Sequence, residues 1–342
     1  MIPALIDRLL AGERPDPSAL EDVFQRILGG QADPIQVSGL LVALRSIPLD
    51  SETLAACASV LRQHRRAVRC QVRPLIDTCG TGGDGSGTFN ISTGAALAVA
   101  AAGGAVAKHG NRSVSSKTGS ADVLETLGVR LEVPPNQAAR IIDATGFAFL
   151  FAPLYHPVMA HVMPVRRALG IRTLFNMVGP LSNPALAEFQ VLGVFDAGLT
   201  EVMAGALKIL GTRGALVVHC GGLDEIGIHD VTHGHRLLED RIEPWSVSPE
   251  DVGIARAPIE DLLGGEADEN AAILRKVLEG ESGPRADVVA LNAGAACWVG
   301  GLAGTLADGV ALARETLANG GALRVLERAC ESTARALDGD DR

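Results

Sequence analysis

The sequence predicts an α/β fold: a small all-helical N-terminal domain, then a large domain whose mainly parallel central sheet is flanked by helices. Residues 1 to about 66 show only helical patterns, whereas short apolar runs alternate with longer helical segments from about residue 73. The chain has 40 glycines and only 3% aromatic residues, which favours alanine-rich helices packed closely on a sheet. We therefore expect domains at residues 1–70 and 73–342, with helices from about 155–182 joining the first.

Four short helices are expected in the N-terminal domain. The first spans Ile2–Leu10. Ser18-Ala-Leu-Glu21 has the form of a capping box and is expected to open the second helix, which Gly29-Gly30 ends. Asp33-Pro34 places an N-cap and a proline at the start of the third helix, and Asp50-Ser51-Glu52 opens the fourth.

Strands and helices are expected to alternate in the larger domain. Strand candidates are 75–78, 105–107, 147–151, 189–194 and 214–219. Helix candidates are 94–102, 121–127, 135–144, 200–210, 268–279, 287–299, 311–319 and 322–337. This alternation favours a mainly parallel sheet covered by helices. A hairpin is expected around Glu239-Asp240, and the acidic segment 248–269 is expected to be an irregular surface connection.

Composition and charge limit the classes of partner. The net charge of −10 argues against a nucleic-acid footprint, which needs a basic face. The six cysteines are scattered without a CxxC pair, as expected for small buried residues in a reducing compartment. Gly85–Ala107 is uncharged but too weakly apolar to span a membrane, and no signal peptide is evident. We expect a soluble, cytoplasmic protein without a nucleic-acid or membrane partner.

The stretch Asp77–Thr93 predicts an anion site. Five of the eight residues from Gly80 to Gly87 are glycine, which is tolerated where positive φ or close backbone approach is needed. A strand, a glycine loop and a helix N-terminus together direct backbone N–H groups at an anion; the alternative is a flexible connector. Both common nucleotide motifs fit poorly: Lys108 lies where a dinucleotide site needs an acid, and no Lys-Ser or Lys-Thr closes the loop.

A second stretch, Lys108–Gly128, supplies cations and hydroxyl groups just after the second expected strand. Facing a glycine loop, these groups suit a ligand with several phosphates; the alternative is a solvated loop. Ser120 is expected to cap the helix at 121–127. The polar residues concerned are Lys108, Arg112, Lys117, Ser113, Ser115, Ser116, Thr118 and Ser120.

Two further segments carry candidate binding groups. Asp224 and Glu225 follow the strand at 214–219 and, near a polyphosphate, indicate Mg²⁺ rather than a solvated turn. Zinc at His229, His233 and His235 is disfavoured, because these side chains need not converge on a hairpin and no cysteine lies near.

The segment 156–184 contains three arginines. Arg166 is a candidate to hold a carboxylate, with Met177 and Pro180 as walls for an aromatic acceptor. Arg167 and Arg172 lie in the same segment, and all three arginines fit surface positions equally well.

Taken together, these motifs resemble the anthranilate phosphoribosyltransferase family over essentially the whole chain. The family's marks stand in order and at family spacing: GTGGD, NIST, KHGNRSVSSKTGSADVLE, PVRRALGIRTLFNMVGPLSNP and GLDEI. Common phosphoribosyltransferases carry paired acids on a strand, whereas here Asp77 stands alone. The chain also departs from the family at Gly227–His235, where a segment richer in Ser and Thr is expected.

The resemblance implies residue roles. Phosphoribosyl pyrophosphate would be held by Gly80, Gly83, Asp84, Thr88, Asn90, Ile91, Ser92, Thr93, Lys108, His109, Gly110, Asn111, Arg112, Ser113, Val114, Ser115, Ser116 and Ser120. Anthranilate would contact Gly80, Asn111 and Arg166, with His109 nearby and His156 as a weaker candidate. Mg²⁺ would be held by Ser92, Asp224 and Glu225.

The resemblance also implies the reaction and assembly. It implies transfer of a phosphoribosyl group to anthranilate in tryptophan biosynthesis, and a homodimer formed through the N-terminal helices. No general base is assigned. Three alternatives remain: a pyrimidine nucleoside phosphorylase, a non-catalytic nucleic-acid-binding paralogue, and a dehydrogenase.

Overall fold

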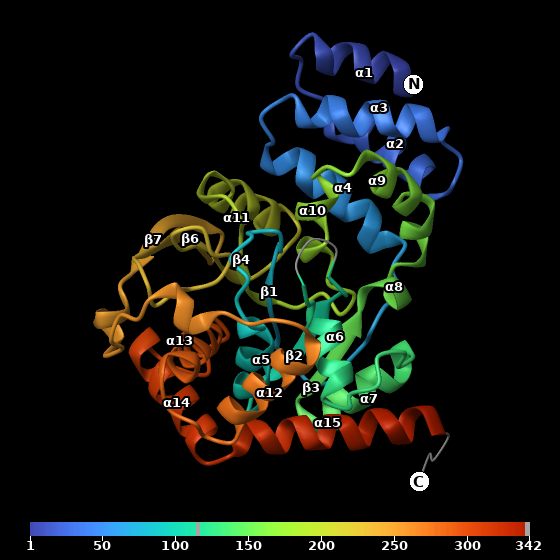
Figure 1. Cartoon of the computed structure of the whole chain (residues 1–342). Coiled ribbons are helices and arrows are strands. Elements are labelled where there is room, and N and C mark those ends of the chain that lie inside the picture. Colours follow the sequence, from blue (N-terminus) through green and yellow to red (C-terminus); the bar gives the residue numbers. More distant parts are fainter. Residues whose placement is uncertain (114–116, 339–342) are drawn as a thin grey trace.

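A seven-stranded sheet forms the centre of the protein, whose computed structural model describes residues 1–113 and 117–338 (Figure 1). The strand order is β3-β2-β1-β4-β5-β6-β7. The first five strands in this order are parallel, and β6 and β7 are antiparallel additions at one edge. The predicted mainly parallel sheet is confirmed. The strands are β1 (Leu75–Gly80), β2 (Ala105–Gly110), β3 (Phe147–Phe151), β4 (Phe189–Gly193), β5 (Gly214–His219), β6 (Thr232–Leu238) and β7 (Arg241–Val247).

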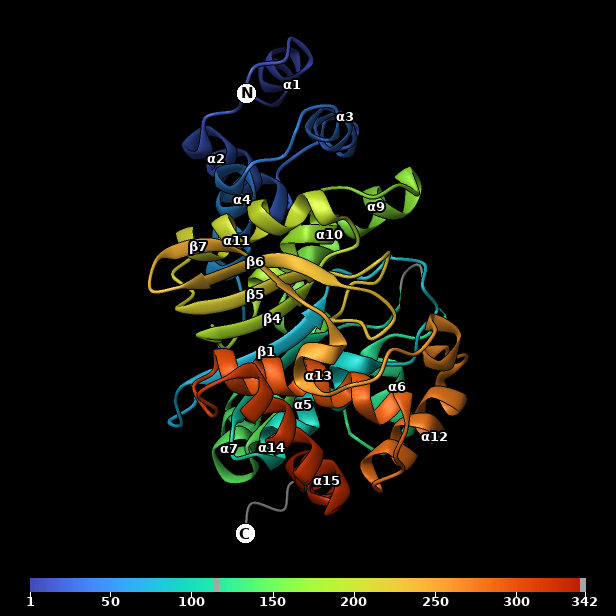
Figure 2. The same ribbon diagram turned by 90° about the vertical axis from the view of Figure 1, so that its left-hand side faces the viewer.

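Side chains alternate across the sheet because successive residues of a strand point to opposite faces. Ile76, Val106 and Leu216 pack on one face against the large helices of the C-terminal half. On the other face, Cys79 and Val217 pack with the N-terminal helices, and a third core forms beneath β2 and β3. Figure 2 shows the sheet between these two helical layers, with the N-terminal helices at one end of the molecule.

The N-terminal unit contains the four expected helices. Asp33 and Asp50 cap their helices as predicted. The predicted capping box at Ser18 is wrong: Asp16 is the N-cap, Pro17 is the first helical residue, and the Asp16 carboxylate accepts a 2.8 Å hydrogen bond from the Ser18 backbone N–H. Proline fits this first position because its missing N–H needs no partner there. The helices are α1 (Ile2–Leu10), α2 (Pro17–Leu28), α3 (Pro34–Arg45) and α4 (Ser51–Gln63).

Short helices between residues 152 and 182 pack against this unit. α9 lies on α3, and α10 lies on α4. Their apolar residues, including Val165 and Phe175, share one core with α1–α4 and α11. These elements are α8 (Ala152–Tyr155), η1 (Pro157–His161), α9 (Met163–Leu169), α10 (Phe175–Val178) and η2 (Pro180–Ser182).

The helices of the larger unit occur where they were expected, with two changes that affect the site. The helix expected from residue 94 begins at Ile91, so Ser92 and Thr93 belong to its first turn. Gly119, not Ser120, is the N-cap of α6, and the Asp122 carboxylate closes the cap by accepting the Gly119 N–H at 2.9 Å. The helices are α5 (Ile91–Ala101), α6 (Ser120–Thr126), α7 (Pro135–Thr145), α11 (Thr200–Ile209), α12 (Ala267–Leu278), α13 (Pro284–Val299), α14 (Leu306–Ala318) and α15 (Gly321–Asp338).

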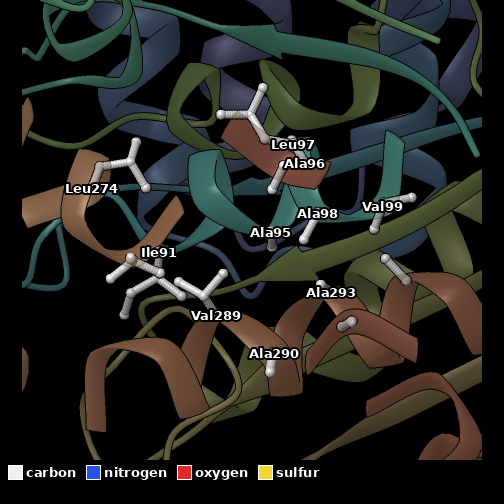
Figure 3. Packing of buried hydrophobic residues seen from close by; sticks show 14 of the residues in the cluster. Ile91, Ala95, Ala96, Leu97, Ala98, Val99, Leu274, Val289, Ala290 and Ala293 are labelled. Atoms are coloured by element: carbon white, nitrogen blue, oxygen red, sulfur yellow. The ribbon is translucent and has the colours of Figure 1, made fainter. Parts of the chain in front are cut away.

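Small side chains allow α5 and α13 to pack closely beneath the sheet (Figure 3). Ala95, Ala98, Ala290 and Ala293 are completely buried. At Gly94 an added Cβ would lie 2.9 Å from a Leu274 methyl and 3.0 Å from a Val289 methyl. The alanine-rich composition therefore sets how near the helices come to one another and to β1.

The remaining connections are more regular than expected. The hairpin extends the central sheet as β6 and β7, and Glu239 and Asp240 at its tip both have positive φ, as a type I′ turn requires. The segment 248–269 contains two short 3₁₀ helices, η4 (Pro249–Val252) and η5 (Ile259–Leu262); η3 (Ala197–Leu199) precedes α11. Within residues 1–113 and 117–338, no helix is long and apolar enough to cross a membrane.

Candidate active site

The glycine loop follows β1 and leads into α5. Gly82, Gly83, Gly85 and Gly87 have φ between 69° and 77°, a region that side chains with a Cβ rarely adopt. The loop therefore needs these glycines for its backbone conformation. It lies at the carboxyl ends of the parallel strands, where open α/β sheets bind ligands.

Lys108 is a buried cation inside the sheet rather than a loop residue. The strand expected at 105–107 continues to Gly110, so Lys108, His109 and Gly110 are the last residues of β2. The Lys108 side chain is 1% exposed. Its ammonium donates to the Thr78 carbonyl and, at 3.3 Å, to the Ser92 hydroxyl. One cation thus joins β1, β2 and the first turn of α5.

The acidic loop after β5 lies against the glycine loop. Asp224 Oδ2 accepts a 2.7 Å hydrogen bond from Gly82 N–H, and the Asp224 N–H donates to Asp84 at 3.2 Å. Glu225 Oε1 accepts from Ser92 N–H at 3.1 Å, at the positive end of α5. Three carboxylates, from Asp84, Asp224 and Glu225, therefore gather beside the N-terminus of α5.

Burial and mutual repulsion disfavour the charged forms of Asp224 and Glu225. Removal of water raises the pKa of Asp224 well above its usual value, and the nearby Asp84 and Glu225 charges raise it further. Removal of water also raises the pKa of Glu225 to about 7, although Lys108 opposes this shift. A cation in this place would offset the excess negative charge.

Hard oxygen ligands of this kind fit Mg²⁺, which commonly uses one or two carboxylates together with substrate phosphates. Within residues 1–113 and 117–338, no three His, Cys, Asp or Glu side chains form a ready-made metal cluster. The predicted set of Ser92, Asp224 and Glu225 therefore fits a metal ion that takes some ligands from the protein and the rest from a bound polyphosphate. These three residues lie together through the Ser92–Glu225 hydrogen bond.

Two strand-end glycines make room for the acidic loop. A Cβ at Gly80 would collide with the Asp224 carboxylate, and one at Gly193 would overlap the Asp224 carbonyl. Neither glycine has positive φ. Glycine is needed at both positions because the loop that follows β5 lies too close to the ends of β1 and β4 to leave room for a Cβ atom.

Residues 111–113, at the start of the polar loop, are held to α6 by ion pairs and hydrogen bonds. Arg112 lies 2.8 Å from both the Asp122 and the Glu125 carboxylates, so carboxylates already neutralise the charge expected to bind phosphate. The Ser113 N–H donates to Asp122 at 3.2 Å, and the Ser120 hydroxyl approaches the Asn111 carbonyl at 3.5 Å. The predicted residues Val114, Ser115 and Ser116 lie outside the described part of the chain.

The other predicted donor-site residues surround the glycine loop. Thr88 forms a β-bridge with Leu263, and the Asn90 side chain accepts from Asn270 at 3.1 Å. Ile91 and Thr93 are buried in the first turn of α5. At Gly110 an added Cβ would collide with the Ser120 hydroxyl, so the end of β2 and the start of α6 touch.

The arginine segment approaches the glycine loop from the helical side. Arg172 donates to the Gly83 carbonyl, and its guanidinium lies 4.3 Å from the centre of the Phe195 ring. Arg166 lies 5.6 Å from the centre of the Phe175 ring. Within the described residues Arg166 pairs with no carboxylate, and burial lowers its pKa. Arg166 is thus a half-buried cation available to an anionic ligand, whereas Arg167, which also has no ion pair among the described residues, is exposed.

Two buried histidines are in contact at the site: His109, near the end of β2, and His156, between α8 and η1. The rings of His109 and His156 meet edge to face, with centroids 5.1 Å apart. His109 Nε2 and both ring nitrogens of His156 are buried without hydrogen-bond partners among the described residues. Burial lowers the pKa of both, that of His156 to about 4, so both rings are neutral at pH 7.

Asp77, which has no role predicted from the sequence, binds the end of β2 through the His109 backbone. The Asp77 side chain is fully buried, and its carboxylate accepts from His109 N–H at 3.2 Å and from the Asn183 amide at 2.8 Å. Burial raises its pKa to about 6, opposed chiefly by Lys108. An isolated acid within an apolar strand was the available signal, but its partner Asn183 lies 106 residues away in the chain.

The three hairpin histidines have separate surroundings. His229 packs against Gly221 and Gly227 in the acidic loop. His235 shares a 3.0 Å hydrogen bond with the Thr200 hydroxyl, and His233 is exposed on β6.

Comparison with known proteins agrees with this arrangement. Residues 72–323 match the glycosyl transferase family a/b domain, and residues 3–65 match the helical bundle domain of the same family. The chain is 48% identical over 336 residues to the anthranilate phosphoribosyltransferase of Symbiobacterium thermophilum, covering 97% of this chain and 98% of that protein. The chain belongs to the anthranilate phosphoribosyltransferase family.

Solved structures of this family have the same fold. The Thermus thermophilus anthranilate phosphoribosyltransferase superposes with a TM-score of 0.91 at 47% identity, covering 96% of this chain and 99% of that one. The Saccharomyces cerevisiae anthranilate phosphoribosyltransferase, at 27% identity, has a TM-score of 0.88 over 97% of this chain and 98% of that one. The yeast protein has been solved in complex with phosphoribosyl pyrophosphate and Mg, and with 4-fluoroanthranilate. The predicted family and enzyme class are confirmed.

Proposed function

We propose that this enzyme transfers the 5-phosphoribosyl group of phosphoribosyl pyrophosphate to the amine of anthranilate, as a step of tryptophan biosynthesis. The observation that carries the proposal is the meeting of the glycine loop, Lys108 and the acidic pair at one sheet edge, in a chain that matches this family over nearly its full length. The new bond joins the amine nitrogen to C1 of the ribose. The bond from C1 to the pyrophosphate oxygen breaks, and the amine loses one proton.

The donor would lie along the glycine loop and the ends of β1 and β2. Lys108 and the backbone amides of residues 80–87 supply positive charge and N–H donors where the pyrophosphate leaves, in surroundings from which protein excludes water. The predicted donor residues between Gly80 and Thr93, those from Lys108 to Ser113, and Ser120 would border this space.

Mg²⁺ is proposed at Ser92, Asp224 and Glu225, together with donor phosphates. Bound there, it would neutralise charge developing on the leaving pyrophosphate. The chain's own contribution is to hold both carboxylates, Asp224 by Gly82 N–H and Glu225 by Ser92 N–H.

Anthranilate is proposed to lie between Gly80, Asn111, His109 and Arg166. Arg166 would receive its carboxylate, and the neutral ring of His109 would contact the acceptor without adding charge. The amine of anthranilate is already nucleophilic, so positioning beside C1 supplies much of the rate enhancement. No side chain is assigned as a general base.

Two predictions about organisation accompany the reaction. Residues 1–70, with the helices from about 155–182, are proposed to form one unit and residues 73–342 the other. The enzyme is proposed to be a cytoplasmic homodimer joined through its N-terminal helices, with no nucleic-acid partner.

The decisive measurement is anthranilate fluorescence over time with phosphoribosyl pyrophosphate and Mg²⁺, repeated with EDTA. Loss of fluorescence that needs both donor and metal is expected. A flat trace from folded protein contradicts the proposal. Phosphorolysis of thymidine or uridine would then identify the related phosphorylase activity.

A further inference from the structure

A short segment, Leu262–Gly265, links the two loops of the donor site; we call it the strap. The strap pairs with the glycine loop on one side: Phe89 N–H donates to the Leu262 carbonyl at 3.0 Å, and Gly264 N–H donates to the Gly87 carbonyl at 2.9 Å. On its other side the Thr118 hydroxyl donates to the Gly265 carbonyl at 2.8 Å. The strap thus contacts both polar loops, although more than 140 residues separate it from either.

Asn270, in the first turn of α12, holds the strap. Its side-chain oxygen accepts from Gly265 N–H at 2.8 Å, and its amide nitrogen donates to the Asn90 side chain at 3.1 Å. Asn270 is only 2% exposed. A Cβ at Gly264 would collide with the Asn270 oxygen, so the amide and the strap are in direct contact.

Both backbone polar groups of Gly265 therefore form hydrogen bonds with side chains. Its N–H binds Asn270, and its carbonyl receives Thr118. α12 also packs against α6, the helix that the 111–119 loop enters (Figure 2). Arg285 fixes the far side of the strap by donating to the carbonyls of Asp261 and Leu263. A buried amide with several partners has one favourable orientation, because any other orientation leaves polar groups unsatisfied.

We infer that Asn270 is a positioning residue for the donor site, which sets the glycine loop and residues 117–119, just before α6, in register through the strap. This inference rests on the proposed function, since both loops are assigned to phosphoribosyl pyrophosphate. Asn270 lies outside the predicted substrate and metal contacts and acts through Asn90 and Gly265. The segment 248–269, expected to be a surface connection only, thereby becomes part of the support of the site.

The kinetic test is Asn270→Ala, measured against Leu278→Ala. Leu278 is fully buried at the other end of α12, so its truncation lowers the stability of the fold without touching the strap. For Asn270→Ala we expect the KM for phosphoribosyl pyrophosphate to rise about 10-fold, because both loops shift. The KM for anthranilate should change less than about twofold. Kinetics indistinguishable from those of Leu278→Ala overturn the inference.

A double mutant tests the route through Gly265. Thr118→Val removes the hydroxyl donor and nearly keeps the shape of the side chain. If Thr118 and Asn270 act through the same residue, Gly265, the double variant should raise the donor KM no more than about as much as Asn270→Ala alone. Fully additive effects contradict a shared route.

Amide hydrogen exchange without substrates separates this inference from the proposed function. In Asn270→Ala, exchange at Phe89 and at Gly264-Gly265 should be about 10-fold faster, while the α5 core at Ala95–Val99 should keep its protection. If the wild-type enzyme proves inactive towards anthranilate, the proposed function fails and the exchange result alone decides the inference. Unchanged exchange at both places overturns it in either case.

Discussion

Arg166 is a half-buried guanidinium that packs over Phe175 and pairs with no carboxylate among the described residues. Such a cation is costly to bury without a partner, so an anionic ligand that completes it gains a strong, bidentate interaction. Lys108, by contrast, is buried with the Thr78 and Ser92 oxygens as partners. Lys108 therefore has its hydrogen-bond partners within the protein, whereas Arg166 is left to bind an anionic ligand.

Arg166→Ala should weaken acceptor binding selectively. We expect the KM for anthranilate to rise about 100-fold, a loss of roughly 3 kcal/mol for a charged hydrogen-bonded pair, with the KM for phosphoribosyl pyrophosphate nearly unchanged. Arg167→Ala, at an exposed neighbouring position, is the control and should leave both values as they are. Steady-state fluorescence kinetics measure both. Equal increases for the two substrates would remove this role from Arg166.

His156 should make the protein sensitive to acid. Its pKa is about 4 in the folded state, whereas in the unfolded chain it has its ordinary value near 6.5. Unfolded protein therefore binds more protons below pH 6.5, and the free energy of unfolding falls as the pH drops from 6.5 towards 4. The contribution of His156 between pH 7 and 5 is about 2 kcal/mol.

Urea unfolding at pH 7 and pH 5 tests this prediction. His156→Leu should lose less stability over this interval than the wild type, and the exposed His161→Leu should behave like the wild type. Asp77 contributes with the opposite sign, because its pKa is raised to about 6, but it is present in all three proteins and cancels from the comparison. An equal loss in His156→Leu and wild type would show that this ring stays free to ionise in the fold.

At the scale of elements, the site depends on the short distance between the end of β4 and the acidic loop that follows β5. Gly193 closes β4 directly under the acidic loop, and its Cβ position is taken by the Asp224 carbonyl. Its φ is not in the left-handed region. An alanine there is therefore compatible with the strand but not with the loop above it.

Gly193→Ala should displace the acidic loop. We expect kcat/KM to fall about 100-fold, as for other displacements of reacting groups by about 1 Å, and unfolding to become easier by roughly 1–3 kcal/mol. The Mg²⁺ concentration for half-maximal activity should rise. Gly198→Ala, at an exposed glycine whose nearest neighbour atom would be 3.4 Å from the new Cβ, should leave activity and metal dependence intact. A fully active Gly193→Ala enzyme would show that the loop position is unimportant.

At the scale of the whole molecule, the helical unit exposes several apolar side chains. Ile35 is 82% exposed and Val42 45% exposed, seven residues apart on α3, and Leu10 and Ile171 are also exposed in the same unit. Apolar groups collected in this way are typical of a surface that another protein covers. The predicted dimer through the N-terminal helices fits this distribution.

Sedimentation should therefore show a particle of twice the 35.4 kDa chain mass. Replacing Ile35 and Val42 together by glutamate should shift it to the monomer, because two charges would be buried in the interface. The same change at Ile209 and Leu238, exposed apolar residues outside the helical unit, should leave the dimer intact. A monomer at micromolar wild-type concentrations would contradict the prediction.

Local patterns in the sequence determined most of the elements and most of the chemistry. Examples are the caps Asp33 and Asp50, the strand–helix alternation and the five glycines at 80–87. Each depends on the conformational preferences of residues close together in the sequence, which act whatever the tertiary fold. The capping error at Ser18 arose from two overlapping signals, in which proline at position 17 with Asp16 before it was the stronger.

Only the tertiary structure decided which groups meet. The sheet order β3-β2-β1-β4-β5 brings Lys108, Ser92 and Glu225 together, although these residues are spread along the chain between positions 92 and 225. It also buried Lys108, paired Arg112 with Asp122 and Glu125, and placed the strap between two loops. These contacts are non-local: they come from strand pairing and helix packing summed over the whole chain, and no local preference of a residue records them.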